Sequence, residues 1–328
     1  MMQRRQLLQL GMGLGLGHGL GVHAAAREYL VWQERSLVGF GTTLWLKAAH
    51  TDASKLSEAL DASVKAIRSV EKQMSLFDPD SALCHLNRVG ELRKPDAHLL
   101  SVLTLAQYVS RRSAGAFDVT MQPLWNLWLL HAQSQTLPSF KALSQARSLV
   151  NWQAMTVSAD VVRLHVKGMG VSLNGIAQGY AADKVRAVLQ SHGVQHALID
   201  TGETALLGKS AKGEDWRFAV EPSVASTVAP PVIHPQGLAT ATSSDAHTVF
   251  SADHRHHHIL NPHTGDSPTH WSSVSVIAPS CTMADALTKV FFMCPPQAVK
   301  RMAKAWGVGV VLQDKRGQWS SQPSAQLS

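Results

Sequence analysis

The sequence predicts an α+β fold whose sheets are largely antiparallel. Segments with alternating apolar residues occur near both ends and in the middle of the chain, and segments with apolar residues three and four apart lie between them. The two kinds of segment do not follow the regular strand–helix–strand order of a parallel sheet. The chain has 328 residues, of which 45% are hydrophobic and 16% are charged, so it can bury a full core. Length and composition alone allow one large domain or two small ones within residues 27–328.

Residues 1–26 are typical of an export signal. Arg4 and Arg5 precede a weakly apolar, glycine-rich run, and Ala24-Ala25-Ala26 supplies an Ala-x-Ala cleavage pattern. Twin arginines before a modestly apolar core indicate the twin-arginine route, which exports folded proteins. No later run approaches the roughly 18 apolar residues of a membrane-spanning helix. We expect a periplasmic protein that does not span the membrane, and a disordered basic leader is the alternative interpretation.

Charge and cysteine content argue against two classes of protein. The formal net charge is +7, and Arg4 and Arg5 of the leader contribute two of these charges. The remaining excess is mild and unclustered, so we expect no nucleic-acid partner. The three cysteines form no Cys-x-x-Cys pair, which argues against a zinc or iron–sulfur site.

The first half of the chain predicts a strand pair followed by helices. Alternation on both sides of Gly39-Phe40-Gly41 is typical of two strands joined by a turn. Asp52 or Ser54 can cap the next helix, and Pro79 prevents that helix from continuing beyond the turn at its end. In order, we expect two strands within residues 29–49 and helices over residues 52–73, 83–87, 99–112 and 138–150.

The second half predicts most of the strands. Residues 155–166 alternate and run into a glycine-rich turn, after which apolar residues spaced for one helix face begin at Ala177. In order, we expect strands within residues 155–166, 197–200, 216–221, 237–242, 274–278 and 308–313, helices over residues 177–188 and 283–293, and a loose tail over residues 320–328.

The glycine-rich turn before Ala177 is a candidate anion site. Gly175 and Gly179 allow close approach of a ligand to the backbone, and the first N–H groups of a helix can bind a negative charge. An ordinary strand-to-helix turn explains the same pattern.

Asp285 is a candidate metal ligand. On a helix, Thr288 and Lys289 share its face. A carboxylate beside a hydroxyl or carbonyl oxygen suits Mg²⁺, which retains substrate phosphate oxygens among its ligands. A surface ion pair between Asp285 and Lys289 is the alternative.

The segment His254–His258 is dense in histidine. Clustered imidazoles can bind Zn²⁺ or Cu²⁺, but neighbours in one loop cannot all point at one ion. Alternation through His256 and Leu260 predicts a strand from which a single inward histidine, His258, could act as a general base.

Two further stretches could contact a planar ligand. Phe117 and Asp118, near Trp125 and Trp128, combine aromatic surface with a carboxylate. The same residues also suit a capped helix start and a packed core. Met74, at the end of the first long helix, is by itself better explained as core.

Taken together, six stretches resemble the ApbE-type FAD:protein FMN transferase family and occur in the family's order. They cover nearly all of residues 36–300, and no single one is decisive. The stretches are Glu71–Ser75 with Asp80-Ser81 and Leu86-Asn87, Gly115–Thr120 with Pro123-Leu124, Leu173–Asp183, Ala239–Ser243, His258–Gly265, and Ala278-Pro279 with Ala284–Leu287.

The resemblance implies an ApbE-like (T-fold-like) enzyme that binds FAD and Mg²⁺, transfers FMN to a serine or threonine of a partner flavoprotein and releases AMP. It also implies roles for individual residues. Those implied to bind FAD are Met74, Ala116, Phe117, Asp118, Ser172 and Gln178; those implied to bind the metal are Gly175, through its backbone, Asp285 and Thr288; and His258 is implied to deprotonate the partner's hydroxyl.

The chain departs from the family's pattern at four places. Asp-Leu-Gly-Gly is replaced by Ser172–Gly175, a lysine by Gln178, and Asp-Pro-Arg-Thr-Gly by Asn261–Gly265. The hydroxyl expected four residues after Asp285 is replaced by Lys289, whose ammonium could either replace part of the metal's charge or exclude the metal.

Three alternatives stay open, of which the departures at Ser172, Asn261 and Lys289 motivate the first. The first is a flavin-binding carrier or chaperone, and the second is an FAD pyrophosphatase on the same fold. The third is a periplasmic metal-binding protein that uses His254–His258. The family's acceptor pattern, Asp-x-x-Ser/Thr-Gly-Ala-Ser/Thr, is absent from the chain, so self-flavinylation is not predicted.

Overall fold

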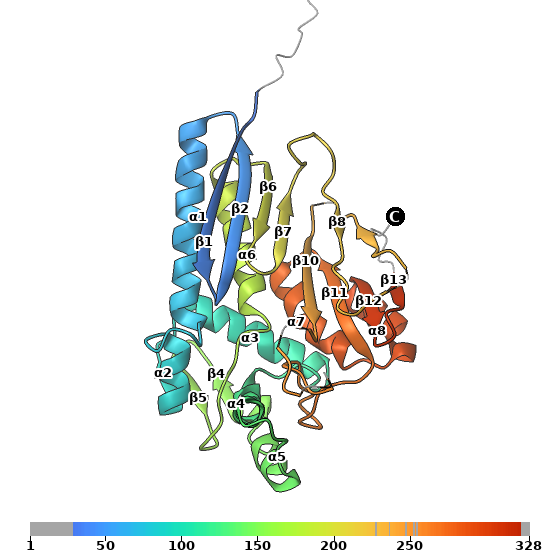
Figure 1. The fold of residues 1–328 in the computed structure, drawn as a ribbon. Helices are drawn as coiled ribbons and strands as arrows, with labels where there is room; N and C mark the ends of the chain where they lie inside the picture. Colours follow the sequence, from blue (N-terminus) through green and yellow to red (C-terminus); the bar gives the residue numbers. More distant parts are fainter. Residues whose placement is uncertain are drawn as a thin grey trace, which may run out of the picture.

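The computed structural model describes residues 29–322 apart from Thr227, Gln236, His247, Ala252 and His254 (Figure 1). It has an α+β fold around an eight-stranded sheet of order β1-β2-β6-β7-β10-β11-β12-β13, in which every neighbouring pair is antiparallel. The predicted fold class is therefore confirmed. The predicted export signal lies outside the described residues. None of the helices in this described part combines the length and hydropathy needed to cross a bilayer.

The strands fall into three sheets. The main sheet contains β1 (Val31–Gly39), β2 (Thr42–His50), β6 (His196–Asp200), β7 (Thr204–Leu207), β10 (Ala239–Ser244), β11 (Trp271–Ala278), β12 (Gly309–Asp314) and β13 (Trp319–Gln322). The two small sheets contain β3 (Glu91–Arg93), β5 (Val161–Leu164) and β4 (Met155–Val157), and β8 (Phe218–Ala219) with β9 (Val232–Ile233).

Eight α-helices and three short 3₁₀ helices connect these strands in the described residues. They are α1 (Ala53–Met74), α2 (Ala82–Val89), α3 (Ala97–Arg112), η1 (Val119–Met121), α4 (Gln122–Gln133), α5 (Phe140–Arg147), η2 (Trp152–Ala154), α6 (Ala177–Ser191), α7 (Cys281–Phe292), η3 (Pro296–Ala298) and α8 (Val299–Trp306).

Helices α1, α6 and α7 form a layer against the main sheet (Figure 1). Helix α1 packs on β1 and β2, α6 packs on β6 and β7, and α7 packs on β10 and β11. Helix α1 begins where Asp52 accepts the N–H groups of Ser54 and Lys55, as the sequence predicts. Its residues Leu56, Leu60 and Ile67 are fully buried, because their spacing places them on the face toward the sheet.

Several elements differ from the prediction. Residues 320–322 belong to β13, which pairs with β12, so a loose tail from residue 320 is wrong. This strand reads Trp-Ser-Ser-Gln and has no apolar alternation, so backbone hydrogen bonds rather than side-chain burial define it. The strand expected over residues 216–221 is reduced to β8. Helices α4 and α8 and strand β7 were not predicted.

The main sheet opens between β7 and β10. These strands pair at only two positions, Ala205 with Ala239 and Thr204 with Thr240. Immediately beyond, the Glu203 carboxylate accepts the backbone N–H of Thr242 at 2.9 Å. The Glu203 side chain thus binds a backbone N–H of β10 that a backbone oxygen of β7 would bind if the pairing continued, and β7 and β10 separate there.

Candidate active site

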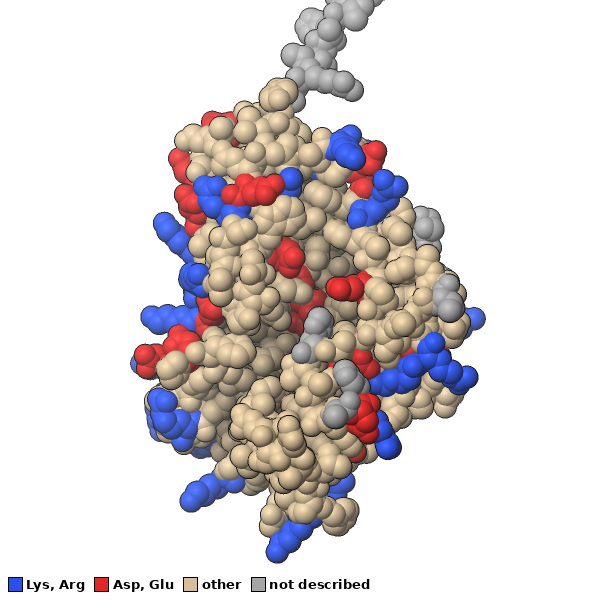
Figure 2. Space-filling model, in the orientation of Figure 1, with Lys and Arg blue, Asp and Glu red and all other residues tan. Residues whose placement is uncertain are grey.

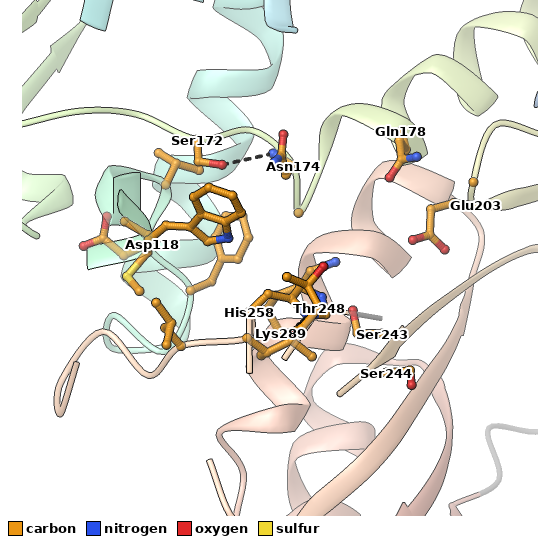
Figure 3. A pocket seen from close by; sticks show the side chains of 18 of the residues that line it. Asp118, Ser172, Asn174, Gln178, Glu203, Ser243, Ser244, Thr248, His258 and Lys289 are labelled. Carbon is orange, nitrogen blue, oxygen red and sulfur yellow. Dashed lines mark hydrogen bonds between the residues drawn. The ribbon is translucent and has the colours of Figure 1, made fainter. Parts of the chain in front are cut away.

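A cavity of about 510 Å³ lies where β7 and β10 separate, and helix starts, strand ends and loops from distant parts of the chain form its wall (Figure 3). Figure 2 shows acidic side chains inside a hollow on this face of the molecule. The start of α6 contributes Gly175 and Gln178, α7 contributes Lys289, and β10 contributes Ser243 and Ser244. The size and the mixed lining are those of a site for a small molecule or cofactor.

Seven of the ten predicted site residues line this cavity. They are Ala116, Phe117, Asp118, Ser172, Gly175, Gln178 and His258. Phe117 and the half-buried Trp125 add aromatic side chains to the cavity lining. Figure 3 shows Gln178, Glu203 and Ser243 grouped on the side of the cavity away from Asp118, so aromatic and polar side chains line one space. These residues come from segments up to about 140 positions apart, so it is the folding of the chain that brings them to one cavity.

Asp118 lies at the cavity wall, but neighbouring backbone and hydroxyl groups already bind its carboxylate. Oδ1 accepts the N–H of Thr120 at 2.8 Å and the Thr120 hydroxyl at 2.6 Å, and Oδ2 accepts the N–H of Trp152 at 3.0 Å. Burial raises the pKa of Asp118 despite these donors. Asp118 therefore caps η1 and holds the wall in place, as the capped-helix interpretation predicts. Its contact with FAD stays a prediction.

Met74 and Thr288 are away from the cavity surface. Met74 is buried in the core at the end of α1, which gives it a packing role. The Thr288 hydroxyl donates to the backbone oxygen of Asp285 at 2.7 Å and lies 2.7 Å from the Ser243 hydroxyl. The predicted FAD contact of Met74 and the predicted metal contact of Thr288 stay predictions that these positions do not support.

The start of α6 is capped by Asp285, a residue of the protein itself. The N–H groups of Ile176 and Ala177 donate to the Leu173 oxygen, and the N–H of Gly179 donates to Asp285 Oδ2 at 3.2 Å. The expectation that the first N–H groups of this helix are free is therefore wrong for these three donors. Gly179 is needed for helix packing, because a Cβ there would lie 2.4 Å from the backbone oxygen of Cys281.

The residues around Asp285 do not fit a magnesium ion. Asp285 is completely buried, and its Oδ1 lies 2.6 Å from the Lys289 ammonium. Mg²⁺ requires nearly octahedral oxygen ligands at about 2.0–2.1 Å. An ammonium has no lone pair to offer, and the Thr288 hydroxyl already donates to the Asp285 backbone oxygen and lies 2.7 Å from the Ser243 hydroxyl. The ion pair foreseen as the alternative is present, but it is buried rather than on the surface.

Two carboxylates near the cavity were not predicted from the sequence. Glu203 lines the cavity, and burial together with the nearby charge of Asp285 raises its pKa well above the usual value. Asp200 accepts the N–H of Gly202 at 2.9 Å, and burial raises its pKa as well. Glu203 is a single acidic residue after Gly202 and belongs to no recognisable sequence motif. Its place in the cavity becomes evident only from the separation of β7 and β10.

The histidine-rich segment does not act as one cluster where it is described. His256 lies 2.7 Å from Asp266 and stacks on Trp128, His257 is fully buried, and His258 lines the cavity. Within the described residues, no group of three or more His, Cys, Asp or Glu side chains is placed to hold a metal ion. His254 lies outside that part of the chain. The arrangement separates the three described histidines into different roles.

Comparisons of the sequence with known proteins agree with one another. A family model described as the ApbE family matches residues 40–312. A Vibrio cholerae protein called FAD:protein FMN transferase is 29% identical over 281 residues, covering 83% of this chain and 84% of that protein. A Klebsiella pneumoniae protein of the same name is 26% identical over 290 residues, covering 84% and 83%.

Solved structures give the same result. The structure described as flavin transferase ApbE from Vibrio cholerae superposes with a TM-score of 0.79 at 25% identity, covering 90% of this chain and 98% of that one. The apo form of Pseudomonas stutzeri flavinyl transferase ApbE superposes with a TM-score of 0.79 at 26% identity, covering 90% and 96%.

Proposed function

The chain belongs to the ApbE family, and from this premise we propose that it is an FAD:protein FMN transferase. The hydroxyl oxygen of a serine or threonine on a partner flavoprotein attacks the phosphorus of the FMN half of FAD. The phosphoanhydride bond breaks, AMP leaves with the bonding electrons, and a base takes the hydroxyl proton. The observation that carries the proposal is the meeting of seven predicted site residues in one cavity that aromatic and polar side chains line.

The cavity supplies groups for each part of FAD. Phe117 and Trp125 can contact the flat ring system through apolar surface. Gln178, Lys289 and Ser243 can donate hydrogen bonds to phosphate oxygens. His258 also lines the cavity and is the candidate base for the partner's hydroxyl. The residues around Asp285 do not fit the magnesium ion that the family resemblance implies, because the Lys289 ammonium occupies Oδ1 of Asp285.

The transfer is tested with an acceptor that carries the family's motif. The protein is incubated with FAD and a domain containing Asp-x-x-Thr-Gly-Ala-Thr, and the control is the same domain with its acceptor threonine replaced by alanine. We expect flavin fluorescence that survives denaturing electrophoresis on the first domain only, with one AMP released per FMN attached. Tight FAD binding without AMP would indicate a carrier, and free FMN with AMP in the absence of acceptor would indicate a pyrophosphatase.

Export to the periplasm completes the proposal. The twin-arginine pattern and the Ala24-Ala25-Ala26 sequence support removal of residues 1–26, which leaves residues 27–328 as the transferase domain. N-terminal sequencing of protein from a periplasmic fraction tests this, and we expect Arg27 as the first residue. Recovery of the uncleaved chain from the cytoplasm alone would contradict it.

A further inference from the structure

Lys289 is the basic residue of α7 that lines the cavity, and we propose that its ammonium group is the resident cation of this site, in place of a divalent metal ion. The inference rests on the proposed function, because FAD supplies the two phosphate groups that such a cation would neutralise. It differs from the family resemblance, which implies Mg²⁺ at this point.

The lysine is held in place by two contacts. Its Nζ lies 2.6 Å from Oδ1 of Asp285, one helical turn earlier on α7, and the acid-before-base order is the favourable one. The Asp285 side chain is 1% exposed and the Lys289 side chain is 22% exposed, so the pair joins the buried interior to the cavity. On the other side, a Cβ built on Gly175 would lie 3.0 Å from Lys289 Cε, so the aliphatic part of Lys289 packs against the start of α6.

The ammonium still has donors for a ligand. It carries three N–H groups, and Asp285 Oδ1 accepts one of them. The contact with the backbone oxygen of Asp285 is long, at 3.4 Å. Lysine binds phosphate as a point charge and needs no fixed geometry, which suits a group that enters from the cavity.

The same arrangement disfavours a second cation. A divalent ion bound to Asp285 would have to displace Nζ from Oδ1 and would then lie beside a like charge. The remaining oxygen, Oδ2, already accepts the N–H of Gly179. Thr288, the nearest hydroxyl on the helix, is turned toward β10. The oxygens of Asp285 and Thr288 are therefore already engaged, and the site contains a cation of its own.

Binding measurements test the proposal without relying on transfer. FAD affinity is measured by flavin fluorescence in excess EDTA and again in millimolar Mg²⁺, and Mn²⁺ binding is followed by the loss of the free-ion electron paramagnetic resonance signal. For the unaltered protein we expect FAD dissociation constants that agree within twofold and no bound Mn²⁺. Loss of FAD binding in EDTA, or one Mn²⁺ bound per chain, would overturn the proposal.

Substitutions at Lys289 sharpen the test. Lys289→Thr provides a hydroxyl four residues after Asp285, so we expect it to bind Mn²⁺ and to bind FAD at least tenfold more tightly with Mg²⁺ than in EDTA. Lys289→Arg keeps the charge and should remain independent of metal. Lys304→Thr, at an exposed lysine on α8, is the matched control and should behave like the unaltered protein. A Lys289→Thr protein that folds, as judged by circular dichroism, but binds FAD equally in EDTA and Mg²⁺ would contradict the role of Lys289.

Failure of this inference and failure of the proposed function give different results. Metal-independent FAD binding without FMN transfer would contradict the transferase and leave the role of Lys289 intact. Transfer that occurs only with a divalent ion would support the transferase and contradict the role of Lys289. If FAD does not bind at all, the transferase proposal fails, and the Mn²⁺ measurements on the unaltered protein and on Lys289→Thr still decide between an ammonium site and a metal site.

Discussion

Asp183 of α6 and Asp285 of α7 each cap the helix on which the other lies. Asp183 accepts the N–H groups of Cys281 at 3.0 Å and Thr282 at 2.9 Å, at the start of α7. Asp285 accepts the N–H of Gly179, in the first turn of α6. A carboxylate at a helix start satisfies unpaired donors and complements the helix dipole. The two caps fix α6 against α7 and so position Lys289 at the cavity.

Removing one of these caps should destabilise the whole domain. Asp183→Ala leaves two backbone donors and the Ser280 and Thr282 hydroxyls without their acceptor, so we expect a loss of about 2–3 kcal/mol in the free energy of unfolding. Urea denaturation at pH 7 measures the change. Glu58→Ala, at an exposed position on α1, should change stability by less than about 0.5 kcal/mol. Equal stability of the two variants would argue against the capping role.

Gly179→Ala should force α6 and α7 apart. The added Cβ would lie 2.4 Å from a backbone oxygen, which cannot rotate away, so we expect a destabilisation of about 1–3 kcal/mol. Gly175→Ala is the matched comparison, because the atoms nearest to its Cβ belong to the flexible Lys289 side chain, with Cε at 3.0 Å. Thermal denaturation followed by circular dichroism should give the lower melting temperature for Gly179→Ala. The reverse order would contradict this packing.

His257 should make the protein sensitive to mild acid. Burial lowers the pKa of this histidine to about 4, and its Nδ1 has no hydrogen-bond partner. In the unfolded chain this histidine has the ordinary pKa of 6.5. The contribution of neutral His257 to the free energy of unfolding is therefore fully present above pH 6.5 and is lost as the pH falls toward 4. The loss can reach about 3 kcal/mol.

A substitution at this position measures that contribution. His257→Leu should show a smaller fall in the urea midpoint between pH 7 and pH 4.5 than the unaltered protein. His85→Leu, at an exposed histidine on α2, should follow the unaltered protein. If all three fall equally, another group is responsible for the acid sensitivity.

His258→Ala should separate binding from transfer. If His258 removes the proton from the partner's hydroxyl, its loss should slow FMN attachment by roughly 10²- to 10⁴-fold while FAD affinity changes less than about threefold. Single-turnover transfer and fluorescence titration measure the two quantities. His165→Ala, at an exposed histidine after β5, is the control. A parallel loss of affinity and rate would show that His258 acts mainly in FAD binding.

Local patterns in the sequence predicted those parts of the site that depend on one helix. Apolar spacing predicted α1 and α6, and the four-residue separation predicted that Lys289 would meet Asp285, which the structure confirms at 2.6 Å. The orientation of Thr288 was not predictable, because it depends on Ser243 from β10.

Other parts of the site depend on contacts between segments distant in sequence. Glu203 was missed because its environment is created by the separation of two strands, and a sequence pattern does not record where a sheet opens. The same holds for Gly179, which the sequence marked as a point of close approach without showing that α7 is the partner. The family resemblance implies that the glycine turn and Asp285 share a metal site, and the two do lie close together, but the contact between them is a helix cap.

The narrow junction of β7 and β10 divides the main sheet into two portions that meet through two residue pairs. The apolar packing falls mainly into two clusters, one between α1, α6 and strands β2, β6 and β7 and the other around α7 and strands β10, β11 and β12, and α1 and α6 contribute residues to both. Amide protons of Ala239 and Thr204 should therefore exchange with deuterium oxide sooner than those in the middle of β2 or β11. A nucleotide seated beside this junction would touch both portions, so its arrival would slow that exchange and make the two portions unfold together.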